Sequence, residues 1–244
     1  VALYGNYMLI VMGVQTLMTA MFNSMNAGIG NLVAEGDKRK IMSVFAELFS
    51  IRFLFSCIMC FGVLMITPAF VSFWIGKKYV MDSLSLLLMT AILFVNLSRT
   101  TVDAYINAYG LFGDIWAPIV EASLNVGLSI ILGYYFGLHG VLSGVLISLL
   151  LVVFCWKPYY LFRKGLDERL SIYIFMYARH LMAALLCGVI VCLGMRYSMV
   201  QGDTTFFDGL LGILVFSILS TLTLLCVAPG MRNLMRRFIR MCHV

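Results

Sequence analysis

Seven blocks of apolar residues, each long enough to cross a bilayer as a helix, dominate this sequence. A hydrocarbon core of about 30 Å requires roughly 20 helical residues, and it contains no water to satisfy an exposed backbone. The sequence therefore predicts an all-α fold, a polytopic transmembrane helix bundle. We expect the spans at residues 3–25, 44–70, 82–106, 117–136, 139–156, 178–197 and 206–228.

The polar segments between these blocks divide the chain into four parts. We expect a bundle over residues 1–156 and a basic cytoplasmic loop over 157–177, in which Pro158 stops the fifth helix. Two further spans would occupy residues 178–228, and residues 229–244 would form a basic cytoplasmic tail.

Charge and composition limit the possible partners. Charged residues make up 11% of the chain and hydrophobic residues 62%, whereas soluble domains carry about 25% charged residues. The net charge of +6 therefore indicates membrane boundaries rather than nucleic-acid binding. Lys and Arg gather after the first and fifth spans and in the tail, so the positive-inside rule predicts a cytoplasmic C-terminus and an external start. An external start without a signal peptide suggests that an odd number of spans precedes this chain.

The motifs of soluble enzymes are missing from the sequence. It holds no nucleophile elbow, HExxH pair, Walker loop or dinucleotide glycine motif, so we expect no enzyme activity and no cofactor. Most of the seven Cys residues lie in apolar runs, where a thiol behaves as a small hydrophobe. His139 and His243 stand apart from other ligand types, so we expect no metal site. Arg179 and His180 fall near the inner boundary of the sixth span, where they would reach lipid phosphates.

Small residues recur at four-residue spacing in the fourth and fifth spans. Gly133 and Gly137 lie in one span, and Gly140 and Gly144 lie in the next. Small residues on one helix face allow two backbones to approach closely in a membrane. We therefore assign these glycines to helix packing.

A polar stripe enters the fourth span at its predicted cytoplasmic end. Pro118 suits the first turn of a helix, which would place Glu121 at the positive end of the helix dipole. Asn125 and Ser129 follow on the same face at four-residue intervals. A capping carboxylate with helix–helix hydrogen bonds is the simpler explanation, and the alternative is a stripe that faces water inside the bundle.

Charged residues enter two more spans from the same predicted side. Arg99 and Asp103 have i,i+4 spacing on the third span, and Glu47 and Arg52 lie early in the second. Each ionised group inside a span costs about 2.5–3.5 kcal/mol on insertion scales, so it needs a partner, the interface or water. Local pairing or snorkelling explains each residue singly. Their shared depth instead favours a hydrated cavity in which Arg52 and Arg99 hold an anionic head group.

Five segments carry a resemblance: ALYGNYMLI, AGIGNLVA, FWIGKKY, YGLFGDIWAPIVEASLNVGLSIILGYYFGLHGVLSGVLIS and FCWKPYYLFRKGL. They resemble the polysaccharide flippases, the O-antigen and capsule exporters of the multidrug/oligosaccharidyl-lipid/polysaccharide superfamily. The resemblance covers residues 2–166 and is most specific over 110–148. It implies 12 or 14 spans in two pseudo-symmetric halves around a cationic cavity. It also implies translocation of a polyprenyl-pyrophosphate-linked oligosaccharide from the inner to the outer leaflet by alternating access.

The resemblance would make this chain the second half, plus one helix, of a 14-span protein in the inner (cytoplasmic) membrane. Arg52 and Arg99 would then line the cavity, with Asp103, Glu121 and Asn125 as polar neighbours or gate elements. The implied partners are a lipid-linked oligosaccharide, membrane lipids, a coupling ion and polysaccharide assembly proteins.

Two other functions remain open. An ion-coupled multidrug or other lipid exporter of the same superfamily would share the fold, because fold does not fix the substrate. An acidic cavity would favour cationic drugs, whereas Arg52 and Arg99 favour an anionic lipid. A membrane-embedded glycan polymerase or acyltransferase should carry a large charged outer loop or a His/Asp cluster, and the sequence shows neither.

Overall fold

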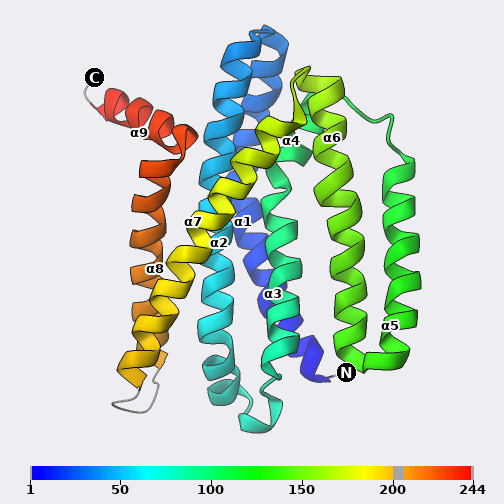
Figure 1. Cartoon of the computed structure of the whole chain (residues 1–244), viewed down its shortest axis with the longest axis vertical. Coiled ribbons are helices and arrows are strands. Elements are labelled where there is room, and N and C mark those ends of the chain that lie inside the picture. Colours follow the sequence, from blue (N-terminus) through cyan, green and yellow to red (C-terminus); the bar gives the residue numbers. More distant parts are fainter. Residues whose placement is uncertain (1, 200–205, 243–244) are drawn as a thin grey trace. The chain divides into compact units, whose positions relative to one another are not determined.

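The structure is a computed structural model that describes residues 2–199 and 206–242, and this part of the chain is all-α (Figure 1). The predicted all-α polytopic membrane bundle is confirmed. The elements in chain order are α1 (Ala2–Glu35), α2 (Lys38–Trp74), the 3₁₀-helix η1 (Lys77–Tyr79), α3 (Ser83–Ser98), α4 (Thr100–Ala108), α5 (Trp116–Leu149), the π-helix η2 (Leu150–Trp156), α6 (Lys157–Leu161), the π-helix η3 (Phe162–Leu166), α7 (Leu170–Met199), α8 (Phe206–Val227) and α9 (Pro229–Cys242).

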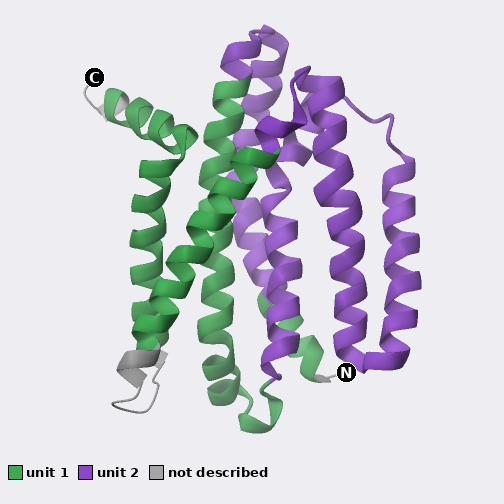
Figure 2. Ribbon diagram, in the orientation of Figure 1, with its two compact units in different colours: residues 1–10, 42–80, 174–244 green, residues 11–41, 81–173 purple. Residues whose placement is uncertain are grey.

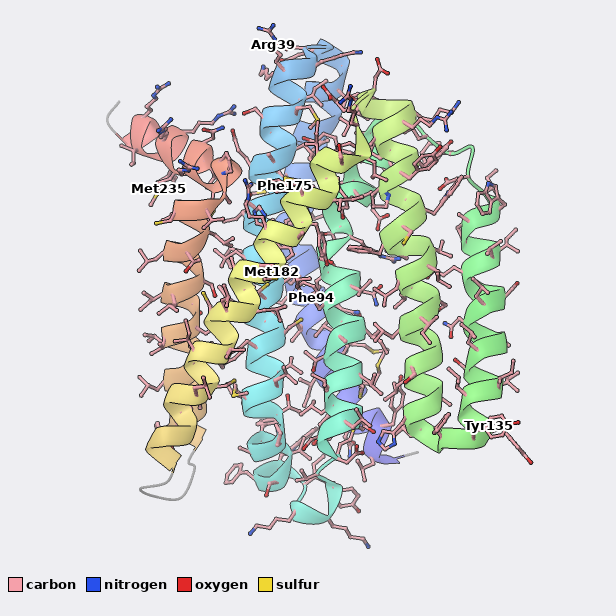
Figure 3. The ribbon with its side chains drawn as sticks, viewed as in Figure 1. Arg39, Phe94, Tyr135, Phe175, Met182 and Met235 are labelled. Carbon is pink, nitrogen blue, oxygen red and sulfur yellow. The ribbon has the colours of Figure 1, made fainter. Side chains whose placement is uncertain are left out.

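Six stretches of the described chain are long and apolar enough to cross a membrane. The longest, Trp116–Leu166, folds back on itself at Gly137, whose φ of 58° lies in the left-handed region that favours glycine. This stretch therefore supplies two crossings, so the described part of the chain contains seven. Tyr135 lies beside the corner and points away from the hairpin (Figure 3), as expected for an aromatic side chain at a membrane interface.

The segment predicted as a basic loop, residues 157–177, is mostly helical. Helix continues from Lys157 through Leu166 and resumes at Leu170, so the turn is only three residues long. Pro158 does not stop the helix, because a π-helical turn precedes it: the N–H of Lys157 donates to the carbonyl of Val152, five residues earlier. The wider turn shifts the hydrogen-bond register where proline lacks its donor. The predicted tail is likewise an ordered helix, α9, as far as the described residues extend.

The chain forms two compact units, which we describe separately (Figure 2). Unit 1 comprises residues 1–10, 42–80 and 174–244, and unit 2 comprises residues 11–41 and 81–173.

Unit 1 is built around α2, with α7 running parallel to it and α8 antiparallel. The antiparallel pair is held by Phe61 and Phe216, whose rings stack with centroids 4.3 Å apart. Tyr177 of α7 packs its ring against Phe49 and Phe53 of α2. These aromatic contacts fix the register of the three helices through dispersion and area burial.

Unit 2 is built around the hairpin of residues 116–166. Gly144 of the second leg packs directly on the first, since a Cβ there would lie 2.7 Å from the backbone N of Ser129. The second leg runs parallel to α3, and Val95 of α3 packs with Leu149 and Val153. The small residue allows the close approach and the apolar contacts hold the third helix against the hairpin.

Candidate functional site

Two polar contacts tie the parallel helices of unit 2 together, one at each end. At one end, His139 Nε2 lies 2.7 Å from Asp82 Oδ2. At the other, Lys157 Nζ lies 2.8 Å from Asp103 Oδ1. At a rise of 1.5 Å per residue the two contacts are about 27–31 Å apart, which is close to one hydrocarbon thickness of about 30 Å. Each contact therefore lies near one membrane boundary.

Asp82 also caps α3, since its side chain accepts the backbone N–H of Ser85 at 3.0 Å. The hydrogen bond with His139 and this capping bond hold the pKa of Asp82 well below its usual range. The carboxylate form is the one that both donors stabilise. This end of unit 2 is therefore an exposed, hydrogen-bonded tie.

At the opposite end, Arg99, Asp103 and Lys157 form what we call the cation cluster. Besides the bond to Lys157, Asp103 pairs through Oδ2 with Arg99 Nε at 3.3 Å. The side chains of Arg99 and Asp103 are 30% and 28% exposed, and that of Lys157 is 19% exposed. Two cations thus share one carboxylate in a partly accessible place, which leaves one formal positive charge uncompensated.

The local sequence explains how the cation cluster forms. The hydroxyls of Ser98 and Thr100 donate to the carbonyls of Val95 and Leu97, and such bonds compete with helix hydrogen bonds where α3 ends and α4 begins. Asp103 then falls in the first turn of α4, where the helix dipole favours an anion.

The guanidinium group of Arg99 has nitrogen atoms that can still bind a ligand. Arg99 uses its Nε atom for Asp103, and its two Nη groups have no hydrogen-bond partner among the described residues. A guanidinium fork matches the oxygens of a phosphate or carboxylate in two parallel bonds. Lys157 adds a compact point charge beside it. The cation cluster therefore has the chemistry of an anion site.

Aromatic side chains pack next to Lys157 at the same end of unit 2. Trp156 makes an edge-on contact with Trp116, with ring centroids 4.6 Å apart, and stacks on Tyr160 at 6.1 Å. Trp116 is 46% exposed. Amphipathic rings of this kind concentrate where head groups meet hydrocarbon, which supports the placement of the cluster at a membrane boundary.

Arg52, the other Arg predicted to line a wet cavity, is in a different environment. It belongs to unit 1 and is only 2% exposed, among the largest fully buried side chains of the described chain. A side chain this buried cannot touch a ligand in this conformation. The candidate site therefore contains Arg99 and Asp103 from the predicted set, together with Lys157, but not Arg52.

Glu121 and Asn125 remain on one face of α5, as predicted, but outside the cluster's contacts. The helix begins at Trp116, two residues before Pro118, so Glu121 lies in the second turn, where the dipole acts more weakly. Asn125 Oδ1 accepts from Ser129 Oγ at 3.2 Å. Asn125 and Ser129 line a shallow groove of about 560 Å³, which is also bordered by Gly133, Gly137 and Val141.

The predicted packing glycines divide into two roles. Gly140 and Gly144 lie against the backbone of the first hairpin leg, and a Cβ at Gly133 would meet the Val141 side chain at 2.8 Å. These three positions allow the two legs to touch. Gly137 instead forms the corner, where its positive φ rather than packing requires glycine.

A second polar group, which we call the α2 polar face, lies in unit 1 and consists of Glu47 and Ser50 of α2, His180 of α7 and Arg237 of α9. Glu47 Oε1 forms an ion pair with Arg237 Nη2 at 3.2 Å, and the Glu47 side chain is 6% exposed. The Nδ1–H of His180 donates to the carbonyl of Met176 at 2.7 Å, and Nε2 lies 2.9 Å from Ser50 Oγ, whose one proton is shared between Nε2 and the carbonyl of Ala46 at 2.7 Å. A neutral imidazole satisfies both bonds.

The burial of His180 corrects the prediction that it reaches lipid phosphates. It is 0% exposed, with its ring against Phe49 and Phe53. Arg179 is half-buried over the ring of Phe175, 5.8 Å from its centroid. The sequence did not predict the contact between His180 and Ser50, because the two residues are 130 positions apart in the chain.

No group of three or more His, Cys, Asp or Glu side chains within residues 2–199 and 206–242 is arranged to hold a metal, and His243 lies outside the described residues. The chain matches no protein-family model, no curated protein and no solved structure. Function must therefore be inferred from the chemistry of the cation cluster and from the sequence itself.

Proposed function

We propose that this chain is part of a membrane flippase that moves an anionic, lipid-linked oligosaccharide from the inner to the outer leaflet by alternating access. The main support is the cation cluster, in which Arg99 and Lys157 share the single carboxylate of Asp103 near a membrane boundary. The resemblance of residues 2–166 to the polysaccharide flippases supports the substrate class, a polyprenyl-pyrophosphate carrier.

The physical task fits such a site. A pyrophosphate carries charge that hydrocarbon cannot solvate, so it must exchange water for protein donors before it crosses. Arg99 can bind phosphate oxygens as a fork and Lys157 can add a point charge, while the lipid tail stays in the bilayer. In a protein with two bundles, alternating access would then carry the head group across.

Orientation follows from the distribution of basic residues. Lys and Arg are concentrated on the loops and tail that the positive-inside rule assigns to the cytoplasm. The cation cluster would then lie at the cytoplasmic boundary of the inner membrane, where the lipid-linked substrate is loaded. Asp103 would hold the two cations in place until the substrate arrives.

Binding to the complete protein tests the proposal. Purified protein in nanodiscs should bind a short polyprenyl pyrophosphate, and Arg99→Ala or Lys157→Ala should weaken this binding at least about tenfold, as loss of a charge-assisted pair predicts. Lys164→Ala is the matched control, because it removes an exposed lysine two turns further along the same helical segment. A neutral polyprenol should bind all forms equally.

A cell-based readout separates binding from transport. The Arg99→Ala, Lys157→Ala double variant should insert normally yet reduce surface glycan display, while Lys164→Ala should not. If the double variant binds the pyrophosphate lipid as tightly as the parent protein, the cluster is a structural tie and the proposal is wrong.

An exporter of cationic drugs is the second candidate. It would be favoured if Asp103→Asn abolished drug-dependent proton or sodium movement while pyrophosphate binding stayed undetectable in every form. The excess of positive charge in the cluster argues against it.

A further inference from the structure

The C-terminal helix α9 has a composition unlike that of the membrane-crossing helices. Its sequence, PGMRNLMRRFIRMC, contains four Arg residues and no acidic residue. At 100° per residue, Arg232, Arg236 and Arg240 form one stripe at i, i+4 and i+8. Phe238 projects from the opposite side, with Met235 and Ile239 between it and the stripe, and the side chains of Met235, Phe238 and Ile239 are 42%, 60% and 48% exposed. The helix is therefore strongly amphipathic, with a cationic and an exposed apolar face.

Chain continuity places this helix at a membrane boundary. The membrane-crossing helix α8 ends at Val227, and α9 begins only two residues later, at Pro229. The axis of α9 turns away from that of α8 within unit 1 (Figure 1). A helix that leaves the end of a membrane span in this way lies at the level of the lipid head groups.

Contacts with α2 fix the first turn and a half of α9. Ala228 is fully buried, Met231 is 5% exposed, and Gly230 packs on the backbone carbonyl of Ala46. Arg237, beside the arginine stripe, pairs with Glu47 of α2. The bundle therefore anchors one edge of the helix and leaves the stripe of Arg232, Arg236 and Arg240 and the residues Met235, Phe238 and Ile239 uncovered (Figure 3 labels Met235).

We propose that α9 is a lipid-binding helix that lies in the membrane interface, with Met235, Phe238 and Ile239 among the acyl chains and Arg232, Arg236 and Arg240 bound to the head groups of anionic phospholipids. Apolar residues alone would favour any bilayer, but three aligned arginines on a helix that contains no acidic residue select a negatively charged leaflet. The inference does not depend on the transported substrate.

Amide hydrogen exchange of residues 229–242 in the complete protein tests this inference. The protein is placed singly in nanodiscs of phosphatidylcholine, or of an equal mixture of phosphatidylcholine and phosphatidylglycerol. Exchange should be at least about tenfold slower in the anionic discs, which is the scale expected for three arginines at a charged surface. Inorganic phosphate added to the phosphatidylcholine discs should not reproduce this protection.

Two triple variants with equal loss of charge make the result specific. Arg232→Gln, Arg236→Gln, Arg240→Gln should abolish the difference between the two discs. Arg163→Gln, Lys164→Gln, Arg169→Gln removes three exposed cations outside α9 and should preserve it.

Three outcomes would overturn the inference. Equal exchange in both discs would show that anionic lipid does not bind α9. Protection by inorganic phosphate alone would show a free-anion site, and protection that appears only in discs holding two protein copies would show that a second chain covers the apolar face.

Discussion

The α2 polar face and the cation cluster both place polar side chains on membrane-crossing helices, yet they differ in exposure and in charge balance. In the α2 polar face, His180 is fully buried and its two ring nitrogens are both satisfied by neutral partners. In the cation cluster, about a quarter of each side chain is exposed and two cations share one carboxylate. Burial with complete pairing indicates a structural role, whereas exposure with surplus charge indicates binding.

We expect the largest effect on stability from a substitution in the buried α2 polar face. His180→Ala removes two hydrogen bonds and a ring packed against Phe49 and Phe53, so the free energy of unfolding should fall by about 2–4 kcal/mol. Unfolding in mixed detergent micelles measures it. Arg179→Ala, at the half-buried neighbouring position, should cost less than about 1 kcal/mol. Equal losses for the two variants would mean that the His180 bonds contribute nothing.

A smaller effect is expected from a substitution in the exposed cation cluster. Asp103→Asn leaves Arg99 and Lys157 without their shared carboxylate, so a pyrophosphate lipid should bind about threefold to tenfold more tightly, while stability falls by about 1 kcal/mol. Equilibrium binding and unfolding measure the two changes. Asp167→Asn disrupts the exposed pair with Lys38, 2.9 Å apart, and should leave binding unchanged. Weaker lipid binding by Asp103→Asn would show instead that the carboxylate is needed to position Arg99 and Lys157 for the substrate.

The smallest expected effect concerns the exposed contact between Asp82 and His139. Asp82→Asn should lower the melting temperature by about 1–3 °C at neutral pH, because an exposed tie contributes little. The pKa of Asp82 is lowered in the folded protein, chiefly by the hydrogen bond with His139, so its stabilisation is complete above the ordinary value of 3.8. The stabilisation is lost as the pH falls through the lowered pKa. A melting difference between parent and variant that persists below the lowered pKa, where the Asp82 carboxyl is protonated, would contradict this assignment.

Local sequence patterns predicted the structural features that depend on residues close together in the chain. The seven spans follow from the length of the apolar blocks, and the Arg99–Asp103 pair follows from i,i+4 spacing. Lys157 was missed because the proline after it predicted a helix end, while the π-helical turn that carries the helix past Pro158 has no simple sequence signature. The Ser50–His180 bond joins residues 130 positions apart, and the burial of Arg52 depends on tertiary packing that no local pattern encodes.

The paired ties of unit 2 have a mechanical consequence. Because Asp82–His139 and Asp103–Lys157 join α3 with α4 to the second hairpin leg at both ends, a slide of one helix past the other by a turn would break both contacts. Hydrophobic mismatch must then be absorbed by tilting the pair together or by deforming the lipid around it. In a membrane with longer acyl chains, the cation cluster would then lie deeper, where Arg99 and Lys157 lose contact with water.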